Sequence, residues 1–101
     1  MAVIVEFLLR GATPEQLYEA ESAASRRGEE KGAPPYDGCM FLAVTQADDG
    51  ARVVAAWRTE GEFLRVLESA LAPDLAIAGL EASDLSVSAA MSMAIPGAKA
   101  P

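Results

Sequence analysis

The sequence predicts an α+β fold whose strands and helices follow the order βαββαβ. Strand-forming apolar runs lie near both ends of the chain, and two more flank Asp48-Asp49-Gly50 at its centre. Two helix starts carry capping signals, Thr-Pro-Glu-Gln from residue 13 and Thr-Glu-Gly-Glu from residue 59. Because the 101 residues hold no further set of elements, we expect one domain over residues 1–95 and a disordered tail over 96–101.

The first strand is expected over residues 3–9, which are apolar on both faces apart from Glu6. A helix follows from Pro14 to about Arg27, with Thr13 as its N-cap and Gln16 completing a capping box. Its apolar face is expected to hold Leu17, Ala20 and Ala24, with Tyr18 beside them and with Glu15, Glu19, Arg26 and Arg27 turned outward. Residues 28–36 combine glycines, charges and Pro34-Pro35, which predicts a loop that could lie over a cavity mouth.

Residues 40–46 and 52–57 predict a hairpin, because Gly50 between them can take positive φ. The second helix is expected to start after Thr59, with Glu62 completing its capping box. We expect Pro73 to interrupt this helix, Asp74 to cap a short further turn and Gly79 to close it.

The last strand is expected over residues 85–95, where the alternation separates two faces. One face holds Leu85, Val87, Met91, Met93 and Ile95, and the other holds Ser86, Ser88, Ala90, Ser92 and Ala94.

The element order is that of the ferredoxin-like fold, a four-stranded antiparallel sheet with both helices on one face and the first and third strands in its centre. Because the other face would remain bare and apolar, we predict a homodimer that buries about 1,200 Å² or more between two sheets.

Composition argues against several classes of partner. The net charge of −7 repels nucleic acid, and the first apolar run is too short to span a membrane. Without histidine and with the single Cys39, the sequence predicts no metal or haem site, and the lone cysteine suggests a cytoplasmic protein. No glycine-rich phosphate-binding motif occurs, so we expect no nucleotide cofactor.

Two stretches, GATPEQLYEA and VVAAWRTEGEFLRVLESALAP, resemble the dimeric α+β barrel superfamily, which includes antibiotic biosynthesis monooxygenases and uncharacterised actinobacterial members. The resemblance covers nearly the whole chain, and it implies a ligand held inside each subunit between the sheet and the helices. It also implies that Trp57 lines this pocket. Phe63 stands where those monooxygenases often have a tyrosine, and Leu42 stands where many relatives carry a histidine.

Three residues are candidates for catalysis. Glu6 places a carboxylate in an apolar strand, where desolvation would raise its pKa toward a range useful for acid–base chemistry; the alternatives are a strand-rim glutamate or an ion pair with Arg58 or Arg10. Tyr18 could donate a hydrogen bond or transfer a proton, or could be a core aromatic residue. Arg58 could fix a ligand oxygen, or could be a solvated strand end.

Ligand-binding candidates share an apolar or aromatic side chain that could line a cavity; the alternatives are a core position for Trp57, packing within a turn for Tyr36, and filling of the core for the methionines. The candidates are Trp57, Leu42, Phe63, Met40, Met91 and Tyr36. The sequence therefore favours a cofactor-independent natural-product tailoring enzyme that binds a hydrophobic, polyketide-like intermediate, of the cyclase or isomerase type more than a monooxygenase. The alternative is a dimer that binds a small molecule without catalysis.

Overall fold

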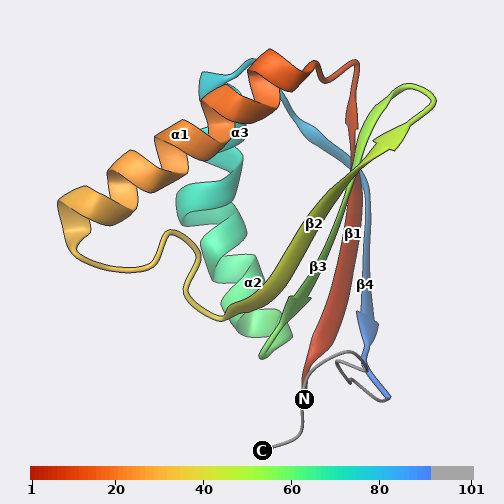
Figure 1. Cartoon of the computed structure of the whole chain (residues 1–101). Coiled ribbons are helices and arrows are strands. Elements are labelled where there is room, and N and C mark those ends of the chain that lie inside the picture. Colours follow the sequence, from red (N-terminus) through yellow and green to blue (C-terminus); the bar gives the residue numbers. More distant parts are fainter. Residues whose placement is uncertain (92–101) are drawn as a thin grey trace, which may run out of the picture.

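The computed structural model describes residues 1–91 of the chain. Its elements are β1 (Val3–Arg10), α1 (Pro14–Lys31), β2 (Cys39–Ala47), β3 (Gly50–Trp57), α2 (Glu60–Val66), the π-helical turn η1 (Leu67–Leu71), α3 (Ala72–Ile77) and β4 (Ala82–Ala89). The four strands form one antiparallel sheet in the order β2-β3-β1-β4, which confirms that the first and third strands are central. Among the described residues, the helices all lie on one side of this sheet (Figure 1).

Side chains alternate between the two faces of the sheet. Val5 and Phe7 of β1 are buried beneath the helices, whereas Glu6 between them lies on the opposite face. The register with β3 continues this division, since Val5 is opposite Ala55 and Phe7 is opposite Val53. The face that carries Glu6 is called the outer face below.

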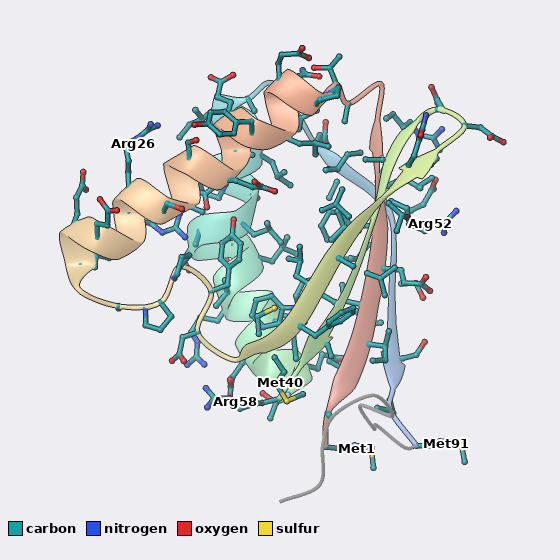
Figure 2. All side chains as sticks on the ribbon, viewed as in Figure 1. Met1, Arg26, Met40, Arg52, Arg58 and Met91 are labelled. Atoms are coloured by element: carbon teal, nitrogen blue, oxygen red, sulfur yellow. The ribbon has the colours of Figure 1, made fainter. Side chains whose placement is uncertain are left out.

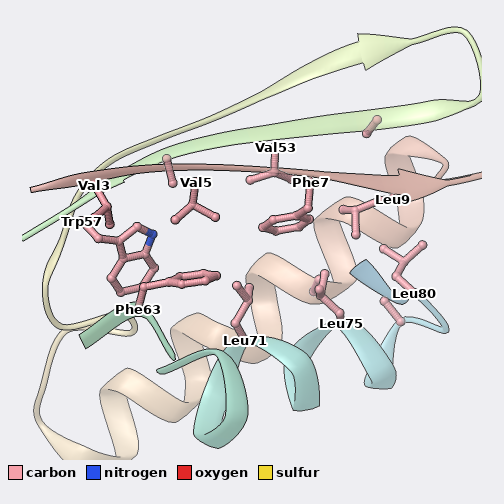
Figure 3. Close-up of a cluster of buried hydrophobic side chains, with 14 residues drawn as sticks. Val3, Val5, Phe7, Leu9, Val53, Trp57, Phe63, Leu71, Leu75 and Leu80 are labelled. Carbon is pink, nitrogen blue, oxygen red and sulfur yellow. The ribbon is translucent and has the colours of Figure 1, made fainter. Parts of the chain in front are cut away.

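The core lies between the sheet and the helices (Figure 3). At one end of the core Trp57 meets Phe63 edge to face, with ring centroids 5.3 Å apart, and both side chains are almost completely buried. Toward the other end, Leu71 and Leu75 from the helices lie against the sheet side that carries Phe7 (Figure 3). Burying a side chain of this size contributes about 1.5–3 kcal/mol, so these contacts hold the helices on the sheet.

The capping box at the start of α1 is confirmed. The Thr13 hydroxyl accepts from the Gln16 N–H at 3.2 Å, and the Thr13 N–H donates to Gln16 Oε1 at 3.0 Å.

The predicted end of this helix was wrong, because residues 28–31 continue α1 instead of forming a loop. The helix ends at Gly32, whose φ of 62° lets its N–H turn back onto the last carbonyls.

The second helical segment runs without a break through α2, η1 and α3, so the predicted interruption at Pro73 was wrong. Pro73 lies in the first turn of α3, directly after a π turn in which the Ala72 N–H donates to the Leu67 carbonyl. The wider turn accommodates the residue that lacks an N–H. Closure at Gly79 is confirmed, since its φ is 76° and the Leu80 N–H donates to the Leu75 carbonyl at 2.8 Å.

The second predicted capping box is only half formed. The Thr59 hydroxyl accepts from the Glu62 N–H at 3.1 Å, as predicted. The Glu62 carboxylate accepts instead from Arg58 Nε at 3.0 Å, so the arginine competes successfully with the Thr59 N–H for this acceptor.

The last strand is shorter and begins earlier than predicted, over Ala82–Ala89 instead of residues 85–95. Its limits follow those of β1, because Ala82 pairs with Leu9 and Ala89 pairs with Val3. The register shifts near Asp84, which takes a φ of 53°. Residues 92–95 of the predicted strand, with Met93 and Ile95, and the predicted tail over 96–101 lie outside the described residues.

No helix within residues 1–91 combines the length and the apolar character that a membrane span requires.

We expect Gly50→Ala to lower the free energy of unfolding by about 2 kcal/mol or more, because an added Cβ would lie 2.2 Å from the Leu9 carbonyl oxygen and φ is 124°. Gly61→Ala is the matched control. Gly61 lies in α2 with nothing within 4 Å of an added Cβ, so alanine there is expected to stabilise by about 0.5–1 kcal/mol. Urea denaturation of both variants measures the difference, and equal effects would contradict the strained turn at Gly50.

Candidate functional site

The candidate site is a cavity between the sheet and the helices with a volume of about 400 Å³. It is called the sheet–helix cavity below. Its walls are mainly apolar and consist of Phe7, Leu9, Leu17, Ala20, Glu21, Ala24, Ser25, Pro35, Tyr36, Leu42, Val44, Val53, Leu71 and Leu75. This position agrees with the one that the family resemblance implied.

A second hollow of about 510 Å³ lies over the end of α1 and the residues that follow it. It is larger, but it is an open depression lined by exposed residues such as Glu29, Gly32 and Pro34. Because a ligand there would remain largely in water, the sheet–helix cavity is the better candidate for small-molecule binding.

Three parts of the fold contribute to the cavity wall. Leu17, Ala20, Glu21 and Ala24 recur at the three- and four-residue spacing that places them on one face of α1. The central strands contribute residues such as Phe7, and edge strand β2 contributes two partly exposed residues. The small alanines keep α1 from filling the space above the sheet, so the cavity depends on their size.

A buried charged cluster joins three segments beside the cavity. Asp74 of α3 is only 3% exposed, and it is the one charged residue among residues 1–91 that is buried. Its Oδ1 forms an ion pair with Arg27 Nη1 of α1, and its Oδ2 accepts from the Tyr36 hydroxyl at 2.8 Å. Arg27 also donates through Nη2 to the Pro35 carbonyl at 2.8 Å and lies over the Tyr36 ring, 5.5 Å from its centroid.

The cluster fixes the protonation state of Tyr36. Burial, and then the hydrogen bond to Asp74, raise the pKa of Tyr36 well above its usual range. The phenol therefore keeps its proton around pH 7 and donates a hydrogen bond to Asp74 Oδ2. In this position Tyr36 shapes the cavity wall, and it cannot serve as a general base.

The structure does not bring the three predicted catalytic residues together. Glu6 lies on the outer face, where it is opposite Val54 and Ser86. The predicted position of Tyr18 against the sheet was wrong, because it lies on the exposed side of α1 with 73% of its surface accessible. Arg58 pairs with Glu62 at 3.0 Å and Asp37 at 3.2 Å near the end of β3, away from the cavity lining. Their catalytic roles stay predictions, and no two of the three share a site.

The predicted ligand-binding residues divide into three groups. Leu42 and Tyr36 do line the sheet–helix cavity. Trp57 and Phe63 are buried against each other in the core and do not line it, so the packing alternative describes their position. The other two lie elsewhere: Met40 is about half exposed near Arg58, and Met91 is fully exposed beyond the end of β4 (Figure 2).

Sequence reasoning missed the polar residues that the structure places at the cavity. Glu21 lines its wall four residues after Leu17, so the helical spacing of the apolar face would have identified it. Arg27 was predicted to turn outward, which is wrong because it is paired with buried Asp74. Asp74 falls at helical spacing between Leu71 and Ala78, and an acidic residue on a buried stripe is a signal that it has a partner.

Cys39 begins β2 and is partly buried. Burial raises the pKa of its thiol, so little of the thiolate forms near pH 7 and the residue has low nucleophilicity.

No model of a known protein family matches the chain, and no curated protein matches its sequence. Among solved structures, the chain is similar to SnoaB, a cofactor-independent oxygenase from Streptomyces nogalater, with 16% identity and a TM-score of 0.56 over 91% of this chain and 93% of SnoaB. It is also similar to a conserved protein from Methanosarcina mazei Go1, with 17% identity and a TM-score of 0.54 over 86% of this chain and 90% of that one. At these identities the likeness establishes the fold, which is the ferredoxin-like α+β fold that the sequence predicted.

We expect Arg27→Met to lower the free energy of unfolding by about 3 kcal/mol, because it leaves the Asp74 charge buried without its partner. Arg26→Met is the matched control on the neighbouring residue, which points away from the sheet (Figure 2) and forms no ion pair within residues 1–91. Its effect should stay within about 0.5 kcal/mol. Thermal or urea denaturation compares the two variants, and similar small losses would show that the buried pair contributes little.

Proposed function

We propose that this chain binds a hydrophobic, fused-ring small molecule in the sheet–helix cavity and acts on it as a cofactor-independent tailoring enzyme. The observation that carries the proposal is the cavity itself, about 400 Å³ of space with mainly apolar walls inside a domain of only 101 residues. This volume lies within the range of about 300–1,000 Å³ that is typical of ligand sites. A polyketide-like intermediate is largely apolar, which suits walls whose one charged residue is Glu21.

The cavity wall offers one carboxylate, Glu21, for acid–base chemistry. A base at this position could remove a proton next to a ligand carbonyl, which is the first step of isomerisation or cyclisation and also of oxygenation through a carbanion. Returning that proton to a different carbon of the anion would complete an isomerisation. Oxygenation would in addition need groups that stabilise the peroxide anion formed with oxygen, and the residues that line the cavity include no lysine or arginine for this role. This difference favours a cyclase or isomerase, whereas the shared fold of SnoaB favours an oxygenase.

A binding protein without catalysis is the second candidate. It is favoured because Glu6, Tyr18 and Arg58 lie apart from the cavity and Glu21 is exposed to solvent. In that case the apolar walls would supply the affinity, and the molecule would carry or sequester its ligand.

We expect Val44→Trp to weaken binding of the neutral fluorescent probe N-phenyl-1-naphthylamine at least about tenfold, because Val44 lines the cavity and the larger ring would occupy it. Gln46→Trp is the matched control, since Gln46 lies two residues further along β2 and does not line the cavity. Fluorescence titration measures both affinities. Equal weakening by the two variants, or none, would mean that the probe binds elsewhere.

Catalysis is tested on the natural ligand. The protein is purified from an extract of its host, and native mass spectrometry identifies the retained molecule, which is then incubated with fresh protein with and without oxygen. If the chain is an enzyme, Glu21→Gln should reduce conversion at least about 100-fold while it leaves binding within about threefold. Conversion without oxygen indicates a cyclase or isomerase, conversion only with oxygen indicates an oxygenase, and retention without conversion indicates the binding protein.

The proposed assembly is a homodimer in which the outer faces of two sheets pack together. This face exposes apolar side chains, among them Phe41, which is 56% exposed, and Ile4 and Leu8 of β1 are only partly buried there. It also carries Glu6 and Arg52, which have opposite charges and neither of which forms an ion pair within residues 1–91. Arg52 points away from the helices (Figure 2). In an isologous interface, Glu6 of each copy could pair with Arg52 of the other.

We expect Glu6→Arg and Arg52→Glu each to weaken dimerisation at least about tenfold, because like charges would then face one another. The double variant restores opposite charges and should restore the dimer. Sedimentation equilibrium measures the dissociation constants of the wild type, the two single variants and the double variant, with Arg65→Glu on the helical side as the control. A monomeric wild-type protein, or no rescue in the double variant, would contradict this arrangement.

A further inference from the structure

The segment over residues 32–38, called the strap below, connects α1 to β2 and contributes two residues to the lining of the sheet–helix cavity. Its start is fixed on α1, because the Ala33 N–H donates to the Gly28 carbonyl at 3.0 Å. Gly28 permits this close approach, since an added Cβ would lie 2.9 Å from the Ala33 carbonyl oxygen. Its end is fixed on the sheet, where the Arg58 N–H donates to the Gly38 carbonyl at 2.9 Å.

Between these ends, the strap is attached to the helices through the charged cluster. Arg27 holds the Pro35 carbonyl, and Asp74 accepts from the Tyr36 hydroxyl. Apart from Tyr36 and Gly38, the strap residues are exposed, so Tyr36 is the side chain that packs the middle of the strap against the core. Pro35 and Tyr36 also belong to the cavity lining.

The hydrogen bonds that attach the strap are separate from the ion pair that joins the two helices. Arg27 and Asp74 belong to two different helices and pair directly with each other, with no strap residue between them. The strap contributes a hydroxyl and a carbonyl, both neutral groups that can exchange their partners for water. Releasing Tyr36 would therefore remove part of the cavity wall without leaving a buried charge unpaired.

We propose that the strap is a gate to the sheet–helix cavity and that the Tyr36–Asp74 hydrogen bond is its latch, with Asp74 as a positioning residue. The proposal rests on the proposed function, since a gate requires a ligand that enters this cavity. With the latch closed, Tyr36 and Pro35 complete the wall and keep water from the ligand. With the latch open, the ligand enters or leaves between the strap and the helices.

The latch is tested first without ligand. Tyr36→Phe removes the hydroxyl and keeps the ring, and Tyr18→Phe removes the same group from an exposed position on α1. Hydrogen exchange of the Cys39 amide, which reports on the strap because its N–H donates to the Tyr36 carbonyl at 3.1 Å, should accelerate at least about tenfold in Tyr36→Phe, because the lost bond joins a hydroxyl to a charged acceptor. Exchange of β1 amides should stay unchanged in both variants, and the melting temperature confirms that each is folded. Unchanged exchange in the strap overturns the latch.

The gate is tested by stopped-flow binding of N-phenyl-1-naphthylamine. If the strap controls entry, Tyr36→Phe should raise the association and dissociation rate constants together, each by about tenfold, and leave the dissociation constant within about threefold. Tyr18→Phe should match the wild type. Faster strap exchange with unchanged probe rates overturns the gate and leaves the cavity proposal intact. If neither the wild type nor Tyr36→Phe binds the probe, the proposed function and the gate both fail, while hydrogen exchange still decides the latch.

Discussion

The buried ion pair between Arg27 and Asp74 sets the spacing of the helical layer. One partner comes from the last turns of α1 and the other from α3, so the two helices must cross where both charges are satisfied. Because an unpaired charge at this depth would cost several kcal/mol, other arrangements of the helices are strongly disfavoured. The pair also supplies the hydrogen-bond partners of Tyr36 and of the Pro35 carbonyl.

The sheet–helix cavity results from the side chains that the helices place against the sheet. At one end, Trp57 and Phe63 fill the interior with two aromatic rings in contact. Further along, α1 presents Ala20 and Ala24, whose short side chains do not reach the sheet, and the cavity opens there. The space between the helices and the sheet is therefore closely packed where the aromatic residues meet, and it contains a cavity where the alanines face the strands.

The distribution of ionisable groups limits the chemistry of that site. Alternation along β1 sends Glu6 to the outer face while its neighbours Val5 and Phe7 enter the core, so a carboxylate in a central strand does not become a cavity residue. On α1, Tyr18 is exposed, whereas Glu21 lies on the cavity wall one turn after Leu17. The ionisable side chains that line the cavity are one carboxylate and a phenol whose hydroxyl is hydrogen-bonded to Asp74, among largely apolar walls.

The sequence by itself determined the element order, the central hairpin, the Thr13 capping box and the position of β1 and β3, because alternation, turn residues and caps act within a few neighbouring residues. Only the tertiary structure decided that α1 continues past Gly28, that the second helical segment passes Pro73, and that Asp74 meets Arg27 and Tyr36. Each of these depends on contacts between segments far apart in the chain, and burial there outweighs the local preferences of glycine, proline and aspartate.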